Sequence, residues 1–313
     1  MEIKFSILIP AYKTVFLDEA ILSVKNQDYS NWELVIVDDD SPFDVFSIVN
    51  KYKDSRIRYF RNDKNCGAIN VVDNWNICLG YSTGEYVICM GDDDRLLSCC
   101  LSEYSKLIKE YPNLNVYHAW TQIIDEKGNV TKVLEPSPKW ESFYSLTYYR
   151  WTNRRQFIGD FCYRKDYLSR NNGYYKLPLA WMSDDITAAR AALDNGIANT
   201  SVPCFEYRIS SVTISNSTNM TEVKLNSSIT GHQWYKNILL HVDPETLSES
   251  DKWYYSSLLS LVDSVCERRM LGEIINEVQS NPVRILKWFF RCTKFRLRRK
   301  TYVKRIVLSI FIN

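Results

Sequence analysis

Three features are missing from this sequence, and each absence excludes a class of protein. None of the nine cysteines forms a C-x-x-C pair, so the spacing predicts reduced cytoplasmic thiols rather than a zinc or disulfide framework. The apolar run from Phe5 to Ile9 stops at Pro10 and is too short for a signal peptide. No run of about twenty apolar residues follows that could span a membrane. No G-x-G-x-x-G motif follows the first expected strand, which argues against a dinucleotide-binding fold.

Acidic residues are also missing from the end of the chain. Residues 284–313 contain ten Lys or Arg and no Asp or Glu, whereas residues 1–283 carry 29 basic and 37 acidic groups. An acidic balance in the body argues against general nucleic-acid binding. The basic tail predicts a local anionic partner.

The tail has the periodicity of an amphipathic helix. Apolar residues stand at positions 285, 288, 289, 292 and 295, and basic residues at 284, 287, 291, 294 and 298. We therefore expect the tail, from about residue 282 to residue 313, to lie on the anionic inner leaflet of the membrane through Trp288, Phe289 and Phe290. A solvated terminal helix or a dimer face is the alternative interpretation.

Short apolar runs alternate with helical periodicity through the N-terminal hundred residues. The runs are rich in β-branched and aromatic residues, which favours buried strands. The four expected strands are Phe5 to Ile9, Leu34 to Val37, Ile57 to Phe60 and Tyr86 to Met90. Strands that alternate with helices predict an α/β fold with a mostly parallel, Rossmann-like sheet flanked by helices.

The rest of the chain is expected to extend this fold. Further strands are predicted at Val116 to Ile124, Val130 to Leu134, Phe157 to Tyr163 and Cys204 to Ile209, and helices at Leu101 to Tyr111 and Ser183 to Leu193. Residues 135–155 are rich in Pro, Trp and Tyr without periodicity, which is typical of a loop with a short helix that covers a site. The pattern is helical from Trp234 onward and predicts a C-terminal helical extension.

Two of the expected strands end in three consecutive aspartates, Asp38 to Asp40 and Asp92 to Asp94. Adjacent carboxylates repel one another and favour neither helix nor sheet, so buried strands do not ordinarily end this way. Ligands bind at the carboxyl ends of parallel strands. There, one cluster would hold a divalent cation against a diphosphate, and an Asp of the other would accept the imide hydrogen of uracil or thymine. A solvated turn that caps the next helix is the alternative.

Six short motifs resemble the nucleotide-sugar glycosyltransferases of family 2, which have the GT-A fold. The motifs occur in the same order and at similar distances, which makes the set far more specific than any single one. They are Ser6 to Tyr12, Val37 to Ser41, Asn65 to Gly67, Asn74 to Asn76, Gly84 to Tyr86 and Gly91 to Asp94. The resemblance implies an inverting enzyme that moves a sugar from a nucleotide diphosphate to an acceptor hydroxyl, as in bacterial capsule, O-antigen and exopolysaccharide synthesis.

The resemblance also implies roles on the donor side. Asp39, or its neighbour Asp38, would read the base, and Asp92 and Asp94 would span the D-x-D motif that binds Mn²⁺ or Mg²⁺. The commonest family form is Asp-x-Asp-Asp, and its first Asp falls on Gly91 here, which leaves the direct metal ligand open among the three aspartates. The remaining implied donor residues are Pro10, Ala11 and Tyr12 along the nucleoside, Gly67 close to the donor, and Asp93 and Arg208 near the diphosphate.

A second acidic pair, Asp184 and Asp185, opens the helix expected after Ser183. Helix capping would explain such a pair. The resemblance implies instead that Asp185, with Asp184 as the alternative, takes the proton of the acceptor hydroxyl. Trp181 would stack on the acceptor sugar, or it is an ordinary core residue.

Tyr207 to Ser210 resembles the late family motif Tyr-Arg-x-His. Ser210 stands in place of the His, so metal ligation is not expected there. Arg208 would bind the diphosphate or form a structural ion pair.

These predictions combine into one organisation. Residues 1–215 would form the GT-A catalytic domain, with a donor half at 1–115 and an acceptor half at 116–215, and residues 216–313 would form the helical C-terminal region. The donor is expected to be a UDP-sugar, with dTDP next and GDP less favoured, because an Asp suits an imide. The acceptor would be a glycan, in particular one linked to polyprenyl diphosphate, and the enzyme would attach peripherally to the cytoplasmic face of the membrane.

Two rival functions remain at this point. A sugar nucleotidyltransferase should carry a Gly- and Lys/Arg-rich loop after the first strand, which Ile9 to Lys13 does not provide. A catalytically inactive, membrane-associated scaffold would bind nucleotide weakly or not at all.

Overall fold

The computed structural model describes residues 2–210 and 220–311. These residues divide into two compact units. The first runs to Lys176 and resumes from Ser183 to the end of the last strand, and the second consists of Leu177–Met182 and the helices from residue 220 onward.

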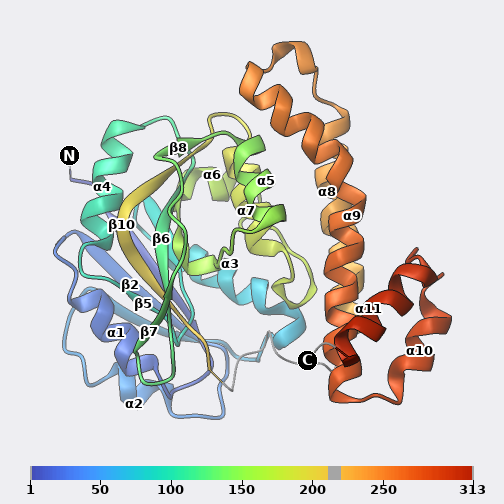
Figure 1. Cartoon of the computed structure of the whole chain (residues 1–313). Helices are drawn as coiled ribbons and strands as arrows, with labels where there is room; N and C mark the ends of the chain where they lie inside the picture. The colour runs from blue at the N-terminus through green and yellow to red at the C-terminus, as the bar shows by residue number, and fades with distance from the viewer. Residues whose placement is uncertain (1, 211–219, 312–313) are drawn as a thin grey trace. The chain divides into compact units, whose positions relative to one another are not determined.

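A ten-stranded mixed sheet forms the centre of the first unit (Figure 1). Its order is β3-β2-β1-β4-β9-β6-β10-β5, with β7 beside β6 and β8 beside β10. The four strands β1 to β4 are parallel, and β9 separates β4 from the parallel pair β6 and β10. The strands are β1 Phe5–Ala11, β2 Trp32–Asp38, β3 Ile57–Arg61, β4 Tyr86–Cys89, β5 Arg95–Leu96, β6 Val116–Ile124, β7 Val130–Val133, β8 Trp140–Glu141, β9 Phe161–Arg164 and β10 Ile197–Arg208.

Helices cover both faces of this sheet, with α1, α2 and α4 on one face and α3, α6 and α7 on the other (Figure 1). Apolar residues spaced three and four apart explain the packing; α1, for example, buries Leu17, Ala20, Ile21 and Val24 against the strands. The helices are α1 Leu17–Lys25, α2 Val45–Val49, α3 Val71–Tyr81, α4 Cys100–Glu110, α5 Phe143–Thr152, α6 Lys165–Arg170 and α7 Ser183–Ala192, with short 3₁₀ turns η1 Ala68–Asn70 and η2 Ile158–Asp160.

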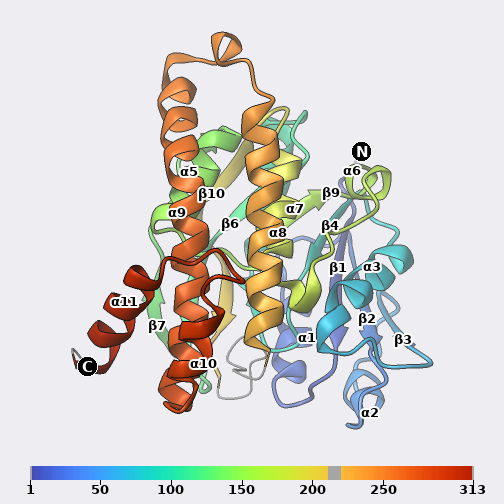
Figure 2. The same ribbon diagram turned by 90° about the vertical axis from the view of Figure 1, so that its right-hand side faces the viewer.

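The second unit is a helical hairpin with two further helices. Helices α8 and α9 lie side by side, and α10 and α11 pack against α9 (Figure 2). The 3₁₀ turn η3 packs against α8. The elements are η3 Pro178–Ala180, α8 Thr221–Leu240, η5 Pro244–Thr246, α9 Glu249–Ser280, α10 Arg284–Arg291 and α11 Arg299–Phe311. No helix among the residues described is long and apolar enough to cross a membrane.

The apolar stripe of the tail does not face outward, which corrects the sequence prediction. Trp288 is fully buried, and Cys292 and Phe295 belong with it to the core of the second unit. The chain turns back after Ser280, so α10 buries this stripe against α9 instead of presenting it to lipid. Of the predicted lipid contacts only Phe290 is exposed, at 70%, and it is joined by Val283 at 86% and Leu286 at 67%.

The predicted fold class is confirmed: a mixed α/β sheet flanked by helices, followed by a helical C-terminal region. One predicted strand is only partly right. The segment from Phe157 begins as the 3₁₀ turn η2, because the Asp160 carboxylate accepts a hydrogen bond from the Phe157 amide at 3.1 Å and closes the turn. The strand β9 starts only at Phe161.

Candidate active site

The two aspartates at the end of β2 have different surroundings. The Asp38 carboxylate is fully buried, and both of its oxygens accept hydrogen bonds. Oδ1 accepts from the Ser41 amide at 2.8 Å, and Oδ2 accepts from the Tyr59 hydroxyl at 2.7 Å and from Arg61 Nη1 at 2.6 Å. Asp38 therefore stabilises the strand end and the neighbouring strand β3, and has no oxygen left for a ligand.

Asp39 keeps one carboxylate oxygen available. Its Oδ1 accepts from Asn62 Nδ2 at 2.8 Å and from the Cys66 amide at 2.9 Å, whereas its Oδ2 accepts no hydrogen bond among the residues described. Burial and the adjacent carboxylate raise the pKa of the Cys66 thiol to about 12, so this thiol stays uncharged beside Asp39. The side chain of Asp39 is thus fixed at one oxygen and open at the other.

The other predicted nucleoside-site residues lie at the same edge of the sheet. Ala11, the last residue of β1, pairs with Asp38 and accepts a hydrogen bond from the Asp39 amide at 2.9 Å. Tyr12 follows with its side chain 40% exposed. Gly67 directly follows Cys66 and has a φ of +75°, a left-handed conformation that favours glycine. Pro10 immediately precedes Ala11 within β1.

The second acidic cluster, which follows β4, reaches the same edge. The Asp92 carboxylate accepts hydrogen bonds from the Tyr12 amide at 2.8 Å and from the Lys13 amide at 2.7 Å. Burial and the charge of Asp93 raise the pKa of Asp92 to about 6, although the two amides and the Lys13 ammonium oppose this rise. The Asp92 carboxylate, just after β4, therefore bonds to the backbone just after β1.

Asp93 and Asp94 differ in their hydrogen bonds. The Asp94 side chain is 2% exposed and accepts from the Arg208 amide at 3.0 Å and from the Gly91 amide at 3.3 Å. Burial and the charge of Asp93 raise the pKa of Asp94 well above its usual value, and burial also raises the pKa of Asp93. The Asp93 carboxylate accepts no hydrogen bond from another residue in the described part of the chain.

This clustered charge fits a cation, because a divalent ion would relieve the repulsion that raises these pKa values. Residues 2–210 and 220–311 contain no set of three His, Cys, Asp or Glu side chains arranged to hold a metal alone. A metal at this loop would therefore need further oxygens from a ligand, and a diphosphate supplies such oxygens.

Arg208 is committed to protein partners. Its side chain is fully buried, with Nε donating to the Asp93 carbonyl at 2.7 Å and Nη2 to Glu19 Oε2 at 2.7 Å. Its Nη1 donates to the carbonyls of Asp125 and Glu126 at 3.1 and 3.2 Å. This geometry favours the ion-pair interpretation of Arg208 and shows how the last strand fixes the acidic loop.

The second acidic pair begins α7. Asp185 is 3% exposed, and its Oδ1 accepts from Arg150 Nε at 2.5 Å. Asp184 is more exposed and accepts from the Asp185 amide at 2.9 Å, a local bond typical of helix starts. Arg150, on α5, carries no signal in the sequence that would link it to Asp185.

The Tyr207 hydroxyl has a raised pKa. Burial raises the pKa of Tyr207 to about 12, and the charges of Asp94, Asp93 and Asp184 add to this rise. Tyr207 stands on β10 directly before Arg208. The start of α7 and the acidic loop after β4 therefore act electrostatically on the same point of the first unit.

Trp181 belongs to the second unit, where it is tied to α8. Its indole Nε1 donates to the Ser228 hydroxyl at 3.0 Å, and the Lys224 ammonium lies 4.6 Å from its ring centroid. The three residues Leu179, Ala180 and Met182 beside it have positive φ angles, which are unusual for residues other than glycine.

Comparison with known proteins shows the family. Residues 6–169, more than half of the chain, match the family described as glycosyl transferase family 2. The chain is 34% identical over 133 residues to a Campylobacter jejuni protein named GalNAc(5)-diNAcBac-PP-undecaprenol β-1,3-glucosyltransferase, covering 41% of each chain. It is 30% identical over 133 residues to an Escherichia coli protein named UDP-Glc:α-D-GlcNAc-diphosphoundecaprenol β-1,3-glucosyltransferase, covering 42% of this chain and 51% of that one. This chain thus spans about half or less of the length of both relatives.

Solved structures have the same fold. The S. aureus protein TarS in complex with UDP-GlcNAc aligns with a TM-score of 0.59 at 18% identity, covering 93% of this chain and 80% of that one. The mannosyltransferase PcManGT from Pyrobaculum calidifontis, in complex with GDP-Man and Mn²⁺, aligns with a TM-score of 0.54 at 14% identity, covering 100% of this chain and 88% of that one. The match of residues 6–169 to the family model establishes that the chain belongs to glycosyl transferase family 2.

Proposed function

We propose that this protein transfers a sugar from a nucleoside diphosphate sugar to an acceptor hydroxyl, with inversion at the anomeric carbon. The observation that carries the proposal is that Asp39, with one open oxygen, and the acidic loop after β4 both bond to the end of β1, at one edge of the sheet. Residues 1–115 bind the donor in this proposal, and residues 116–215 bind the acceptor. The names of the two glucosyltransferase relatives and the family membership support the reaction class.

In the donor site, Asp39 rather than Asp38 reads the base. Asp38 has no oxygen left, whereas Asp39 Oδ2 is free to accept the N3 hydrogen of a pyrimidine imide. A UDP-sugar is the preferred donor and a dTDP-sugar the next, because guanine presents a different edge to a carboxylate. In this proposal Tyr12, which is 40% exposed, lines the nucleoside, and Gly67, with a φ of +75°, lies close to the donor.

Mn²⁺ or Mg²⁺ fits the acidic loop. We propose Asp93 as its direct protein ligand, because Asp92 and Asp94 already accept backbone hydrogen bonds that shape the loop. The ion would neutralise the charge that develops on the departing diphosphate. Arg208 is a positioning residue in this proposal. Its Nε donates to the Asp93 carbonyl, and its Nη1 and Nη2 donate to other protein groups rather than to a diphosphate.

The proton of the acceptor hydroxyl is taken by Asp185 in this proposal, with Asp184 as the alternative. The hydroxyl oxygen attacks the anomeric carbon as the carboxylate accepts its proton and the diphosphate leaves on the opposite side. The ion pair with Arg150 fixes the orientation of the Asp185 carboxylate. The charge of Asp184 contributes to the raised pKa of Tyr207. Comparison of Asp184→Asn with Asp185→Asn separates the two assignments, because the base variant loses transfer while keeping nucleotide binding.

The membrane is the proposed location of the acceptor, which we take to be a glycan linked to a polyprenyl diphosphate on the cytoplasmic face. The corrected contact surface is the exposed apolar set Val283, Leu286 and Phe290. Lys300 and Lys304 on α11 are exposed and form no ion pair within the described residues. Exposed apolar side chains near unpaired cations favour peripheral binding to anionic lipid. Trp181 remains the proposed acceptor contact of the second unit.

A thermal shift series tests the proposal against the inactive-scaffold alternative. We expect UDP with Mn²⁺ to raise the melting temperature more than dTDP does, and GDP to raise it least. Asp93→Asn should remove the part of the shift that depends on Mn²⁺. The matched change Asp73→Asn, at an exposed carboxylate of α3, should not. Absence of a shift with every nucleotide would favour the scaffold.

A further inference from the structure

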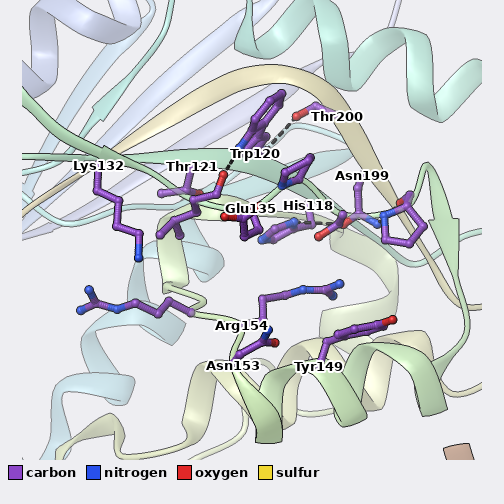
Figure 3. A pocket seen from close by; sticks show the side chains of 15 residues that line it. His118, Trp120, Thr121, Lys132, Glu135, Tyr149, Asn153, Arg154, Asn199 and Thr200 are labelled. Atoms are coloured by element: carbon purple, nitrogen blue, oxygen red, sulfur yellow. Dashed lines mark hydrogen bonds between the residues drawn. The ribbon is translucent and has the colours of Figure 1, made fainter.

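A cavity of about 410 Å³ opens in the first unit between β6, β10, the segment after β7 and the end of α5 (Figure 3). Its volume falls in the range of roughly 300–1,000 Å³ that is usual for small-molecule sites. None of the residues predicted for the donor, the metal or the base lines it. The cavity is therefore a separate place for a ligand within the same unit.

The cavity carries two cations without carboxylate partners. Lys132 and Arg155 line it with exposed side chains, and neither forms an ion pair within the residues described. Arg154 is different, since it is bound to Glu141 Oε1 at 2.5 Å. Figure 3 shows Lys132 on the strand side of the opening and Arg154 on the helix side. One carboxylate, Glu135, also lines the cavity, so the unpaired charge is net positive.

A buried histidine, His118, lines the cavity. Asn199 Nδ2 donates to the Pro138 carbonyl at 2.6 Å, so Asn199 Oδ1 is the acceptor that faces His118 Nδ1 at 3.0 Å. In this arrangement His118 Nδ1 donates the hydrogen bond to Asn199 Oδ1. His118 is 6% exposed, and its Nε2 faces the buried Asp160 carboxylate, with Oδ2 at 3.5 Å. Both ring nitrogens thus have protein groups opposite them, and His118 forms a fixed part of the cavity wall.

Aromatic side chains line the cavity and extend from it to Tyr207 on β10. Trp120 and Tyr149 line the cavity itself, and such rings stack on sugar faces. The Arg155 guanidinium lies 5.7 Å from the Phe157 ring, and Phe157 stacks on Tyr207 with ring centroids 3.7 Å apart.

Tyr207 directly precedes Arg208, whose amide donates to Asp94 Oδ1 at 3.0 Å and whose Nε donates to the Asp93 carbonyl at 2.7 Å. The cavity and the acidic loop are thus linked through the contacts of Arg155, Phe157 and Tyr207.

We propose that this cavity binds a phosphorylated sugar of the acceptor, with the ring beside Trp120 and Tyr149 and the phosphate at Lys132 and Arg155. The inference rests on the proposed function and names the acceptor's chemical class. An uncharged glycan would leave both cations unused, whereas a phosphate accepts charge-assisted hydrogen bonds from each. Free phosphate shares this chemistry, so the test must separate it from a sugar phosphate.

The test is a calorimetric titration of the full chain in saturating UDP and Mn²⁺, so that the donor site is filled. The probes are GlcNAc 1-phosphate, which matches the acceptor sugar in the name of the E. coli relative, inorganic phosphate and GlcNAc. We expect GlcNAc 1-phosphate to bind more tightly than either of the others. The double variant Lys132→Gln/Arg155→Gln should weaken it about tenfold or more. Both side chains are exposed, and an unchanged melting temperature verifies the fold.

The control variant is Lys109→Gln, an exposed lysine of α4 that does not line the cavity and should not change the affinity. If UDP binds but GlcNAc 1-phosphate does not, the inference is overturned and the proposed function survives. If UDP fails to bind as well, both fall. Equal affinity for inorganic phosphate and GlcNAc 1-phosphate, or an undiminished affinity in the double variant, would also overturn the inference.

Discussion

Asp39→Asn should change which pyrimidine the protein prefers. Two donors, Asn62 Nδ2 and the Cys66 amide, meet Asp39 Oδ1 at 2.8 and 2.9 Å. An asparagine at this position must turn its carbonyl oxygen toward these donors, so its NH₂ group takes the place of the open Oδ2. The carboxylate oxygen that accepts the uracil N3–H is thereby replaced by an NH₂ group, which cannot accept this hydrogen.

The size of the effect follows from the lost hydrogen bond. A hydrogen bond to a charged group contributes about 1.5–3 kcal/mol, which corresponds to a loss of roughly 10- to 150-fold in UDP affinity. Cytosine N3 is an acceptor, so the same NH₂ group suits CDP, and the ratio of UDP to CDP affinity should fall further than the UDP affinity alone. Calorimetric titration of UDP and CDP, with Mn²⁺ present, measures both.

Asp38→Asn is the matched control. Both oxygens of Asp38 already accept hydrogen bonds from Ser41, Tyr59 and Arg61. This variant should lose about 1–3 kcal/mol of folding stability and keep the ratio of UDP to CDP affinity. An unchanged ratio in Asp39→Asn, or an equal change in both variants, would refute the assignment of the base to Asp39.

Three further predictions concern stability and the membrane. Burial alone would raise the pKa of Glu33, but hydrogen bonds from Ser6, Thr83 and Arg58 outweigh it and lower the pKa to about 2. This contribution is present above pH about 4.5 and is lost as the pH falls toward about 2, so Glu33→Gln should flatten that part of the stability–pH curve in urea titrations. Arg208→Gln should cost about 3 kcal/mol or more in thermal melts, because it leaves buried carbonyls unpaired, whereas a diphosphate-binding role would weaken UDP binding without that loss. The double variant Leu286→Glu/Phe290→Glu should reduce sedimentation with anionic vesicles about tenfold or more. Leu240→Glu, at a 63% exposed position of the same unit, should not. Equal sedimentation of the wild type and both variants would contradict the proposed membrane-contact surface.

The parts of the fold that depend on local patterns could be predicted from the sequence. The run Leu34 to Val37 lies within β2, and the run Tyr86 to Met90 contains β4, because short runs rich in β-branched and aromatic residues favour buried strands. The meeting of the two acidic strand ends also follows from topology, since β2 and β4 are both parallel neighbours of β1.

The parts that depend on contacts between distant residues could not be predicted. Asp38 and Asp39 are adjacent in sequence, and only the register of β3, which places Arg61 opposite Asp38, shows which of them is occupied. Trp288 has the spacing of a lipid-facing residue, but the reversal of the chain before α10 buries it. Arg208 is likewise assigned by its carbonyl partners in a distant loop.

The central claim is metal-dependent sugar transfer at the acidic loop after β4. Its most direct test is the rate of nucleotide release from a panel of UDP-, dTDP- and GDP-sugars, with and without Mn²⁺, for the wild type and Asp93→Asn. We expect slow release from one donor, most readily a UDP-sugar, that requires Mn²⁺ and is lost in the variant. Absence of release from every donor, or an undiminished rate in Asp93→Asn, would contradict the account.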